Sequence, residues 1–236
     1  MPRRAKGLLL DYGGTLVEEV AYDPHAGGAA LLALAAHVPP GVTLADVTAR
    51  ARRVTRLVSA RRDEFNIETP WPSLTRLIYD FLGVRFDAPL ADLELPYWKA
   101  SVTTRPMPGA REALARLHRA GVPMAVISNS SFGADVITYE LARHGLAEHL
   151  AFVMVSADYV VRKPVPLGVE TAAVRLGVPA EDVWVVGDRL DTDVAAAKAA
   201  GMTAVWLRPT EQQDSTEPDL TVRDWMELVA RVEETQ

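Results

Sequence analysis

Four apolar segments of this chain lead into side chains that could take part in catalysis. These side chains are Asp11 after "KGLLL", Ser128 at the end of "VPMAVIS", Lys163 in the loop after "AFVMVS", and Asp188 after "VWVVG". Two carboxylates, a hydroxyl and an ammonium group are the groups needed to hold a divalent cation and to bind and attack a phosphoryl group. An aspartate before Gly-Gly is ordinarily a turn former, so these residues indicate chemistry only if they meet in space.

The pattern of apolar runs predicts the elements that bring these residues together. From Met107 onward, apolar runs of five to seven residues alternate with amphipathic stretches that close on glycine. Such alternation predicts a parallel sheet covered by helices on both faces. Sites in these sheets form at the carboxyl ends of the strands, where all four side chains are expected. The fold class predicted is therefore α/β, with a three-layer, Rossmann-like core.

The segment between the first strand and Met107 has a different pattern. It contains helical stretches separated by "VPPG" and "NIETPWP", and Thr43 with Asp46 has the spacing of a capping box. We expect no strand there, and we interpret "LELPYWKASVTTRPMPG" (93–109) as a return linker. The predicted domains are a core formed by residues 1–17 and 105–236 and a small α-helical cap domain formed by residues 18–104.

Composition excludes several classes of function. The formal charge of −6 gives no basic surface for nucleic acid or for an anionic membrane. The absence of cysteine excludes disulfides, thiolate metal sites and thiol catalysis. No apolar run is long enough for a membrane span, and the N-terminus has no pattern of a signal peptide. We expect a cytoplasmic protein with a small-molecule substrate, and the sequence leaves open whether it forms a homodimer.

Four short motifs in order resemble those of the haloacid dehalogenase superfamily of phosphohydrolases. The motifs are "DYGGTL" with Asp11 and Thr15, "VISNS" with Ser128, "RKP" with Lys163, and "GDRLDTDVAAAKAAG" with Asp188 and Asp193. The helical insertion between the first and second motifs resembles the mobile cap of many members. One motif alone would be weak, whereas four in order at strand ends are specific.

The resemblance implies a small phosphorylated substrate and a catalytic group formed by Asp11, Ser128 and Lys163. Asp11 would be the nucleophile, and Lys163 would place a positive charge between Asp11 and the phosphoryl oxygens. The substrate-binding residues would be Gly14, Thr15, Ser128, Asn129 and Lys163, with the backbone N–H groups of Gly14 and Asn129 as donors.

The same resemblance implies a Mg²⁺ ion as cofactor. Its protein ligands would be the carboxylates of Asp11 and Asp188 and the carbonyl of Gly13. Asp193 would hold metal-bound water from outside the ligand shell. Magnesium prefers oxygen ligands and keeps several waters, so three protein ligands suffice.

Gly13 departs from the superfamily pattern. Most phosphatases of this kind have a second aspartate two residues after the nucleophile, which protonates the leaving group and then activates water. A positioned acid/base contributes roughly 10²- to 10⁴-fold in rate. The favoured hypothesis is a phosphatase that manages without this acid or takes one from Glu18, Glu19 or the cap.

Two alternatives stay open. One is a phosphonatase-like enzyme that forms a Schiff base on Lys99, the only lysine in the insertion. The other is a phosphate- or metal-binding protein without turnover. The dehalogenase branch is disfavoured because it needs no metal, whereas the acidic fourth motif is intact here. The basic stretch from Arg50 to Arg62 is interpreted as a solvated helix face rather than as a substrate-binding surface.

Overall fold

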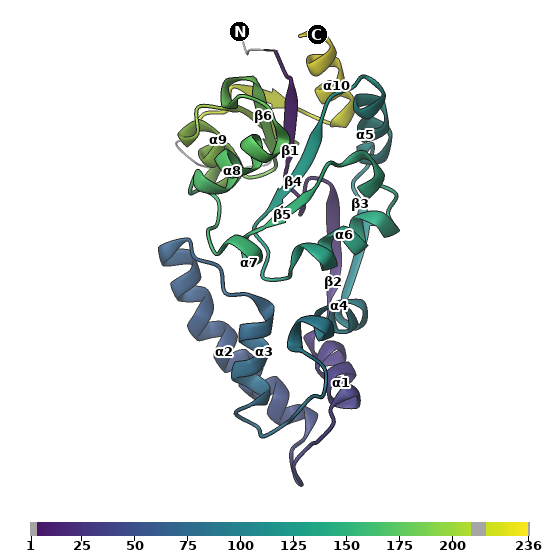
Figure 1. The fold of residues 1–236 in the computed structure, drawn as a ribbon, viewed down its shortest axis with the longest axis vertical. Helices are drawn as coiled ribbons and strands as arrows, with labels where there is room; N and C mark the ends of the chain where they lie inside the picture. The colour runs from purple at the N-terminus through teal and green to yellow at the C-terminus, as the bar shows by residue number, and fades with distance from the viewer. Residues whose placement is uncertain (1–3, 209–215, 236) are drawn as a thin grey trace.

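A six-stranded parallel sheet forms the centre of the molecule (Figure 1). The structure is a computed structural model that describes residues 4–208 and 216–235. The strand order is β5-β4-β1-β6-β7-β8, and every neighbouring pair is parallel. The strands are β1 (Gly7–Leu10), β4 (Met124–Ser128), β5 (Val153–Val155), β6 (Val183–Gly187), β7 (Thr203–Leu207) and β8 (Leu220–Val222). The α/β fold class and its five apolar strands are confirmed, and β8 is a short edge strand that was not predicted.

Helices cover both faces of this sheet. One layer contains α5 (Ala110–Arg119), α6 (Ala134–Arg143) and α10 (Trp225–Glu233), and the other contains α8 (Leu167–Leu176) and α9 (Ala195–Ala199). Leu8 and Leu10 of β1 pack in the apolar cluster of the first layer, whereas Leu9 packs in that of the second. Because successive side chains of a strand point to opposite faces, a strand between two layers must be apolar throughout. This explains the continuous "GLLL" run before Asp11.

The remaining core segments are short. They are α7 (Ser156–Tyr159), the 3₁₀ segments η2 (Ala147–His149) and η3 (Ala180–Asp182), and the π-helical segment η4 (Leu190–Val194) that leads into α9. The last of these contains Asp193.

The cap is a group of helices at the lower end of the molecule in Figure 1. Its elements are α1 (Pro24–Leu34), α2 (Leu44–Phe65), α3 (Trp71–Tyr79), η1 (Leu90–Leu93) and α4 (Glu94–Ser101). It has its own apolar cluster, which includes Leu31, Val47 and Trp71. The predicted capping box at the start of α2 is present, with Thr43 N–H donating to Asp46 Oδ2 over 2.8 Å.

An antiparallel ribbon joins the cap to the core, and here the prediction of no strand in the insertion was wrong. β2 (Val17–Tyr22) pairs with β3 (Val102–Pro106) in a separate two-stranded sheet. Neither strand has the continuous apolar run that identified the core strands, because two glutamates interrupt β2 (VEEVAY) and three polar residues lie within β3 (VTTRP). The proposed domain boundaries at 17/18 and 104/105 fall inside this ribbon, so the cap and the core share it.

Parts of the predicted core domain, residues 1–3, 209–215 and 236, lie outside the described residues. Within the described ranges, no helix combines the length and the apolar character that a membrane crossing requires.

Candidate active site

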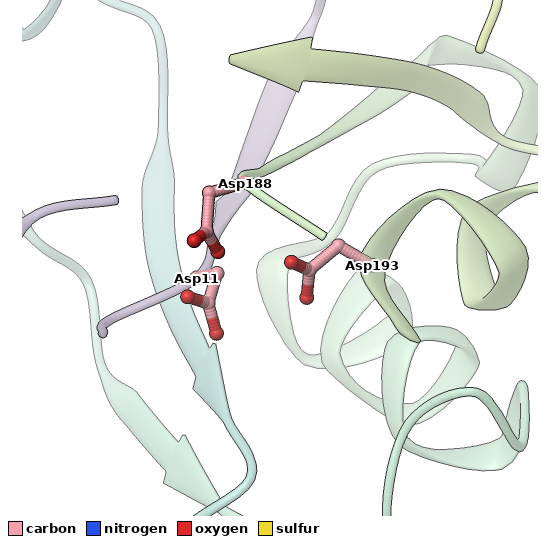
Figure 2. A group of neighbouring side chains, drawn as sticks. All are labelled: Asp11, Asp188 and Asp193. Carbon is pink, nitrogen blue, oxygen red and sulfur yellow. The ribbon is translucent and has the colours of Figure 1, made fainter. Parts of the chain in front are cut away.

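Three carboxylates meet at the carboxyl edge of the sheet (Figure 2). Asp11 directly follows β1, Asp188 directly follows β6, and Asp193 comes from the π-helical segment η4. One oxygen of each carboxylate lies within 4.8 Å of an oxygen of the other two. The neighbouring positions of β1 and β6 in the sheet bring Asp11 and Asp188 together, as their places at strand ends predict.

Lys163 is buried among these acids. Its Nζ lies 2.7 Å from Asp11 Oδ1 and 2.6 Å from Asp193 Oδ1. The same Nζ donates to the carbonyl of Ile127 on β4 over 2.8 Å. A lysine with only 4% of its surface exposed needs such partners, because an unpaired buried charge is costly. The ammonium is therefore held directly beside the predicted nucleophile.

The side chain of Asn129 holds the backbone of Lys163. Its Oδ1 accepts from Lys163 N–H and its Nδ2 donates to the Lys163 carbonyl, both over 2.8 Å. This reciprocal pair ties the loop after β4 to the loop that carries the lysine. From the sequence, only the backbone N–H of Asn129 was assigned to substrate binding. The side-chain contact was missed, since the sequence contains no signal for it.

Burial and mutual repulsion shift the pKa values of the cluster. Burial raises the pKa of Asp11, against the opposing effect of Lys163. Burial raises the pKa of Asp193 to about 6, again opposed by Lys163, and burial with the nearby charge of Asp193 raises the pKa of Asp188. Burial alone would lower the pKa of Lys163, but Asp11 and Asp193 raise it above the usual value. The lysine is therefore charged, and one ammonium faces three crowded acids.

Two glycines make room for these acids. A Cβ on Gly14 would collide with the Asp188 carboxylate, and a Cβ on Gly187 would collide with Asp193. Gly14 also has φ +76°, which side chains disfavour. The sequence led us to expect that the Gly14 N–H would bind a phosphoryl oxygen. In this structure it donates instead to the carbonyl of Val17 over 2.9 Å. The need for glycine at position 14 is steric and conformational.

A cavity of about 820 Å³ opens at this edge of the sheet. Asp11, Gly13, Ser128, Asn129 and Lys163 line it together with Asp193. The predicted substrate residue Thr15 does not line it and is fully buried, with its carbonyl accepting from Trp225 Nε1 over 3.1 Å. The structure thus places Ser128, Asn129 and Lys163 on one cavity, whereas Gly14 does not line it and Thr15 is buried in the core.

The cap closes the opposite side of this cavity. Arg62, Asp63 and Asn66 line it from the end of α2, so the basic stretch is not solvated along its whole length. Arg162 and Arg189 line it from the core. None of these five was predicted as a site residue. For the three cap residues the reason is that which side of α2 faces the core depends on how the cap docks.

Glu18 and Glu19, considered as substitutes for the missing acid, and Lys99, considered as a Schiff-base lysine, differ in whether they reach the cavity. Glu19 on β2 lines the cavity, whereas its neighbour Glu18 pairs with Arg105 Nε at 2.6 Å and does not line it. Lys99 does not line the cavity either, and its Nζ lies 4.5 Å from the ring centroid of Tyr139.

The acidic cluster fits a magnesium ion. Carboxylate oxygens that approach one another this closely form the hard-oxygen donor set that Mg²⁺ selects. Burial, and to a lesser extent the charge of a neighbouring aspartate, raises the pKa of Asp11 and of Asp188, and a divalent cation would offset both effects. Asp193 is already held by Lys163 and by the N–H of Arg189 at 3.1 Å, which suits a role outside the ligand shell.

Comparisons with known proteins agree with this geometry. A model of the haloacid dehalogenase-like hydrolase family matches residues 5–201. Phosphoserine phosphatase of Thermus thermophilus is 35% identical over 125 residues, which are 51% of this chain and 49% of that protein. Phosphoglycolate phosphatase of Neisseria meningitidis is 33% identical over 136 residues, 54% of this chain and 56% of that protein. The matched regions thus span about half the length of these relatives.

A solved structure covers the whole chain. The 2-haloacid dehalogenase from Pseudomonas syringae pv. Tomato DC3000 superposes with a TM-score of 0.69 and 22% identity, covering 100% of both chains. At this level of identity the likeness shows the fold alone, including the helical insertion.

Proposed function

This chain belongs to the haloacid dehalogenase-like hydrolases, and we propose that it is a Mg²⁺-dependent phosphatase that hydrolyses a small phosphorylated metabolite through an aspartyl-phosphate on Asp11. The observation that carries the proposal is the contact of Lys163 with Asp11 beside two further acids, on the wall of a cavity of substrate size. The names of the similar phosphatases support a phosphate ester as substrate. A cytoplasmic location stays a prediction.

The chemistry follows from the positions of the side chains. A carboxylate oxygen of Asp11 attacks phosphorus, and the bond from phosphorus to the ester oxygen breaks as the new bond forms. Lys163 offsets the repulsion between the carboxylate and the phosphoryl group. The hydroxyl of Ser128, which lies on the cavity wall, binds a phosphoryl oxygen. Water then attacks the aspartyl-phosphate, which releases inorganic phosphate and restores Asp11.

Asp11 and Asp188 would hold a magnesium ion as cofactor, with the Gly13 carbonyl as a further ligand. When bound, it supplies positive charge that stabilises the phosphoryl group during transfer. Asp193 also keeps Lys163 in place through the 2.6 Å ion pair.

The leaving oxygen must take up a proton as it departs, and Gly13 cannot provide one. Of the two glutamates that follow the first motif, Glu19 lines the cavity and Glu18 does not. Glu19 is therefore our candidate for the acid/base, and Asp63, which lines the cavity from the cap, is the alternative donor. The same arrangement disfavours the phosphonatase alternative, because Lys99 lies outside the cavity wall.

Phosphate release from a small panel of esters tests the proposal. We would assay p-nitrophenyl phosphate, 2-phosphoglycolate and phosphoserine with Mg²⁺ and with a chelator. We expect Mg²⁺-dependent release that falls at least about 10³-fold in the Asp11→Asn variant, the scale on which losing a covalent nucleophile lowers turnover. Asp87→Asn, at an exposed position of the cap, is the matched control and should retain full activity.

Two results would contradict this proposal, the first its nucleophile and the second its turnover. Turnover that survives Asp11→Asn would show that Asp11 is not the nucleophile. If no ester is hydrolysed, but phosphate with Mg²⁺ raises the melting temperature, the chain binds phosphate without turnover. The absence of an acid at position 13 is the observation that favours this second candidate, a phosphate-binding protein without turnover.

A further inference from the structure

One carboxylate of the cap is buried in the core. Glu68 lies in residues 66–70 between α2 and α3, here named the cap loop, and only 3% of its surface is exposed. Its Oε1 accepts from Ser131 Oγ over 2.9 Å, and its Oε2 accepts from Ser156 Oγ over 2.7 Å. Its Oε2 also forms an ion pair with Arg162 Nη1. A single cap side chain thus contacts three separate core segments.

Backbone hydrogen bonds join the same segments. Glu68 N–H donates to the carbonyl of Val160 over 2.6 Å, and Arg162 N–H donates to the carbonyl of Asn66 over 3.0 Å. These bonds frame an antiparallel bridge between residues 67 and 161. A third bond runs from Trp71 N–H to the carbonyl of Ser131 over 2.7 Å. The cap loop is therefore paired edge to edge with the core loop that leads to Lys163.

The contacts of Glu68 lie beside the catalytic groups, and among its side-chain partners Arg162 lines the cavity. Arg162 directly precedes Lys163, and Ser131 lies three residues after Ser128. The two core loops are joined to each other by Asn129. Glu68 itself does not line the cavity. Its effect on the reaction must therefore pass through the loops that it holds.

We propose that Glu68 is a positioning residue that fixes the Lys163 loop and the loop after β4 when the cap lies against the core. The kinetic part of this inference rests on the proposed phosphatase function. A buried carboxylate with a guanidinium and two hydroxyl donors forms strong, directional bonds, which restrict the loops to one arrangement. When the cap moves away, Glu68 leaves these donors, and the Lys163 loop loses its restraint.

Amide hydrogen exchange tests the structural part without requiring turnover. In the Glu68→Ala variant we expect the amides of residues 160–163 and of Trp71 to exchange at least about tenfold faster. The amides of β1 and β4 should not change. The matched control is Glu64→Ala, because Glu64 is an exposed carboxylate near the end of α2. Unchanged exchange of the 160–163 amides in Glu68→Ala would overturn the proposal.

Steady-state kinetics with p-nitrophenyl phosphate and Mg²⁺ test the positioning role. We expect Glu68→Ala to lower kcat about tenfold to a hundredfold, because small displacements of catalytic groups have effects of this size. KM should change less than about threefold, since Glu68 does not line the cavity and Arg162, which does, is retained in the variant. Glu68→Gln keeps one oxygen acceptor, which can serve one of the two serines, and loses the charge facing Arg162, so its kcat should be intermediate.

A double-mutant cycle separates positioning from general destabilisation. Ser131→Ala should lower kcat in the wild-type background and have no effect in the Glu68→Ala background, because the two residues share one bond. Faster exchange with an unchanged kcat would overturn the positioning role. If the wild-type protein shows no phosphate release, the proposed function fails and the kinetic inference fails with it, while the exchange data still decide whether Glu68 holds the loop.

Discussion

Replacing Gly13 by aspartate would restore the acid that most phosphatases of this family carry two residues after the nucleophile. The structure has room for it, because a Cβ on Gly13 would have no heavy atom within 4 Å. Gly13 does not have a positive φ, so a side chain adds no backbone strain. The residue lines the cavity beside Asp11, so the new carboxylate would face the substrate.

The expected gain depends on the leaving group. A positioned acid contributes about 10²- to 10⁴-fold. We expect a gain at or below the lower end of this range, about 10- to 100-fold or about 1.4 to 2.7 kcal/mol in the barrier, because the new carboxylate joins a site that already contains three acids. An alkyl alcohol needs a proton as it leaves, whereas p-nitrophenolate is stable without one. The gain should therefore appear with alkyl phosphates and be less than about threefold with p-nitrophenyl phosphate.

The assay is kcat/KM for β-glycerophosphate and for p-nitrophenyl phosphate, with saturating Mg²⁺. This ratio reports the steps through phosphoryl transfer to Asp11 and is not sensitive to later hydrolysis of the aspartyl-phosphate. Gly13→Asn is the control, since it has the same shape and no acid, and it should give no gain. Equal gains on both esters, equal gains from aspartate and asparagine, or no gain on β-glycerophosphate would each refute the reasoning.

Two further predictions concern acids outside the motifs. Glu19→Gln should lower kcat/KM for β-glycerophosphate at least about tenfold, and Gly13→Asp in the same chain should restore it; a rate within twofold of wild type would remove Glu19 as the proton donor. Burial raises the pKa of Glu94 to about 7, and the nearby charge of Asp158 acts in the same direction. The hydrogen bond that Glu94 Oε2 accepts from Gly133 N–H over 3.0 Å opposes this shift. Because the folded chain holds this proton more tightly than the unfolded chain, the stability it contributes is lost as the pH rises through about 7. Glu94→Gln should therefore remove about 1 to 3 kcal/mol of the decrease in unfolding free energy between pH 5 and pH 8. Chemical denaturation at the two pH values measures this, and equal decreases in both proteins would contradict it.

The sequence alone determined the core and the acids at its strand ends. Buried parallel strands must be apolar on both faces, so β1, β4, β6 and β7 are visible as short local runs. The residue after such a run lies at the carboxyl edge of the sheet, and this rule is enough to place Asp11 and Asp188 there. These inferences succeed because each depends on residues that are close in sequence.

Only the tertiary structure decided what the cap contributes. The β2–β3 ribbon was missed because its pairing joins two segments without a continuous apolar run that lie about 85 positions apart, for instance Glu18 with Arg105 at a separation of 87. Glu68 meets Arg162 across 94 positions, and neither residue has a local pattern that indicates the other. The roles of Gly14 and Thr15 likewise depended on the positions of Asp188 and Trp225, which are far away in the chain. Local patterns record burial and periodicity, whereas the contacts of a polar side chain depend on which distant segment packs against it.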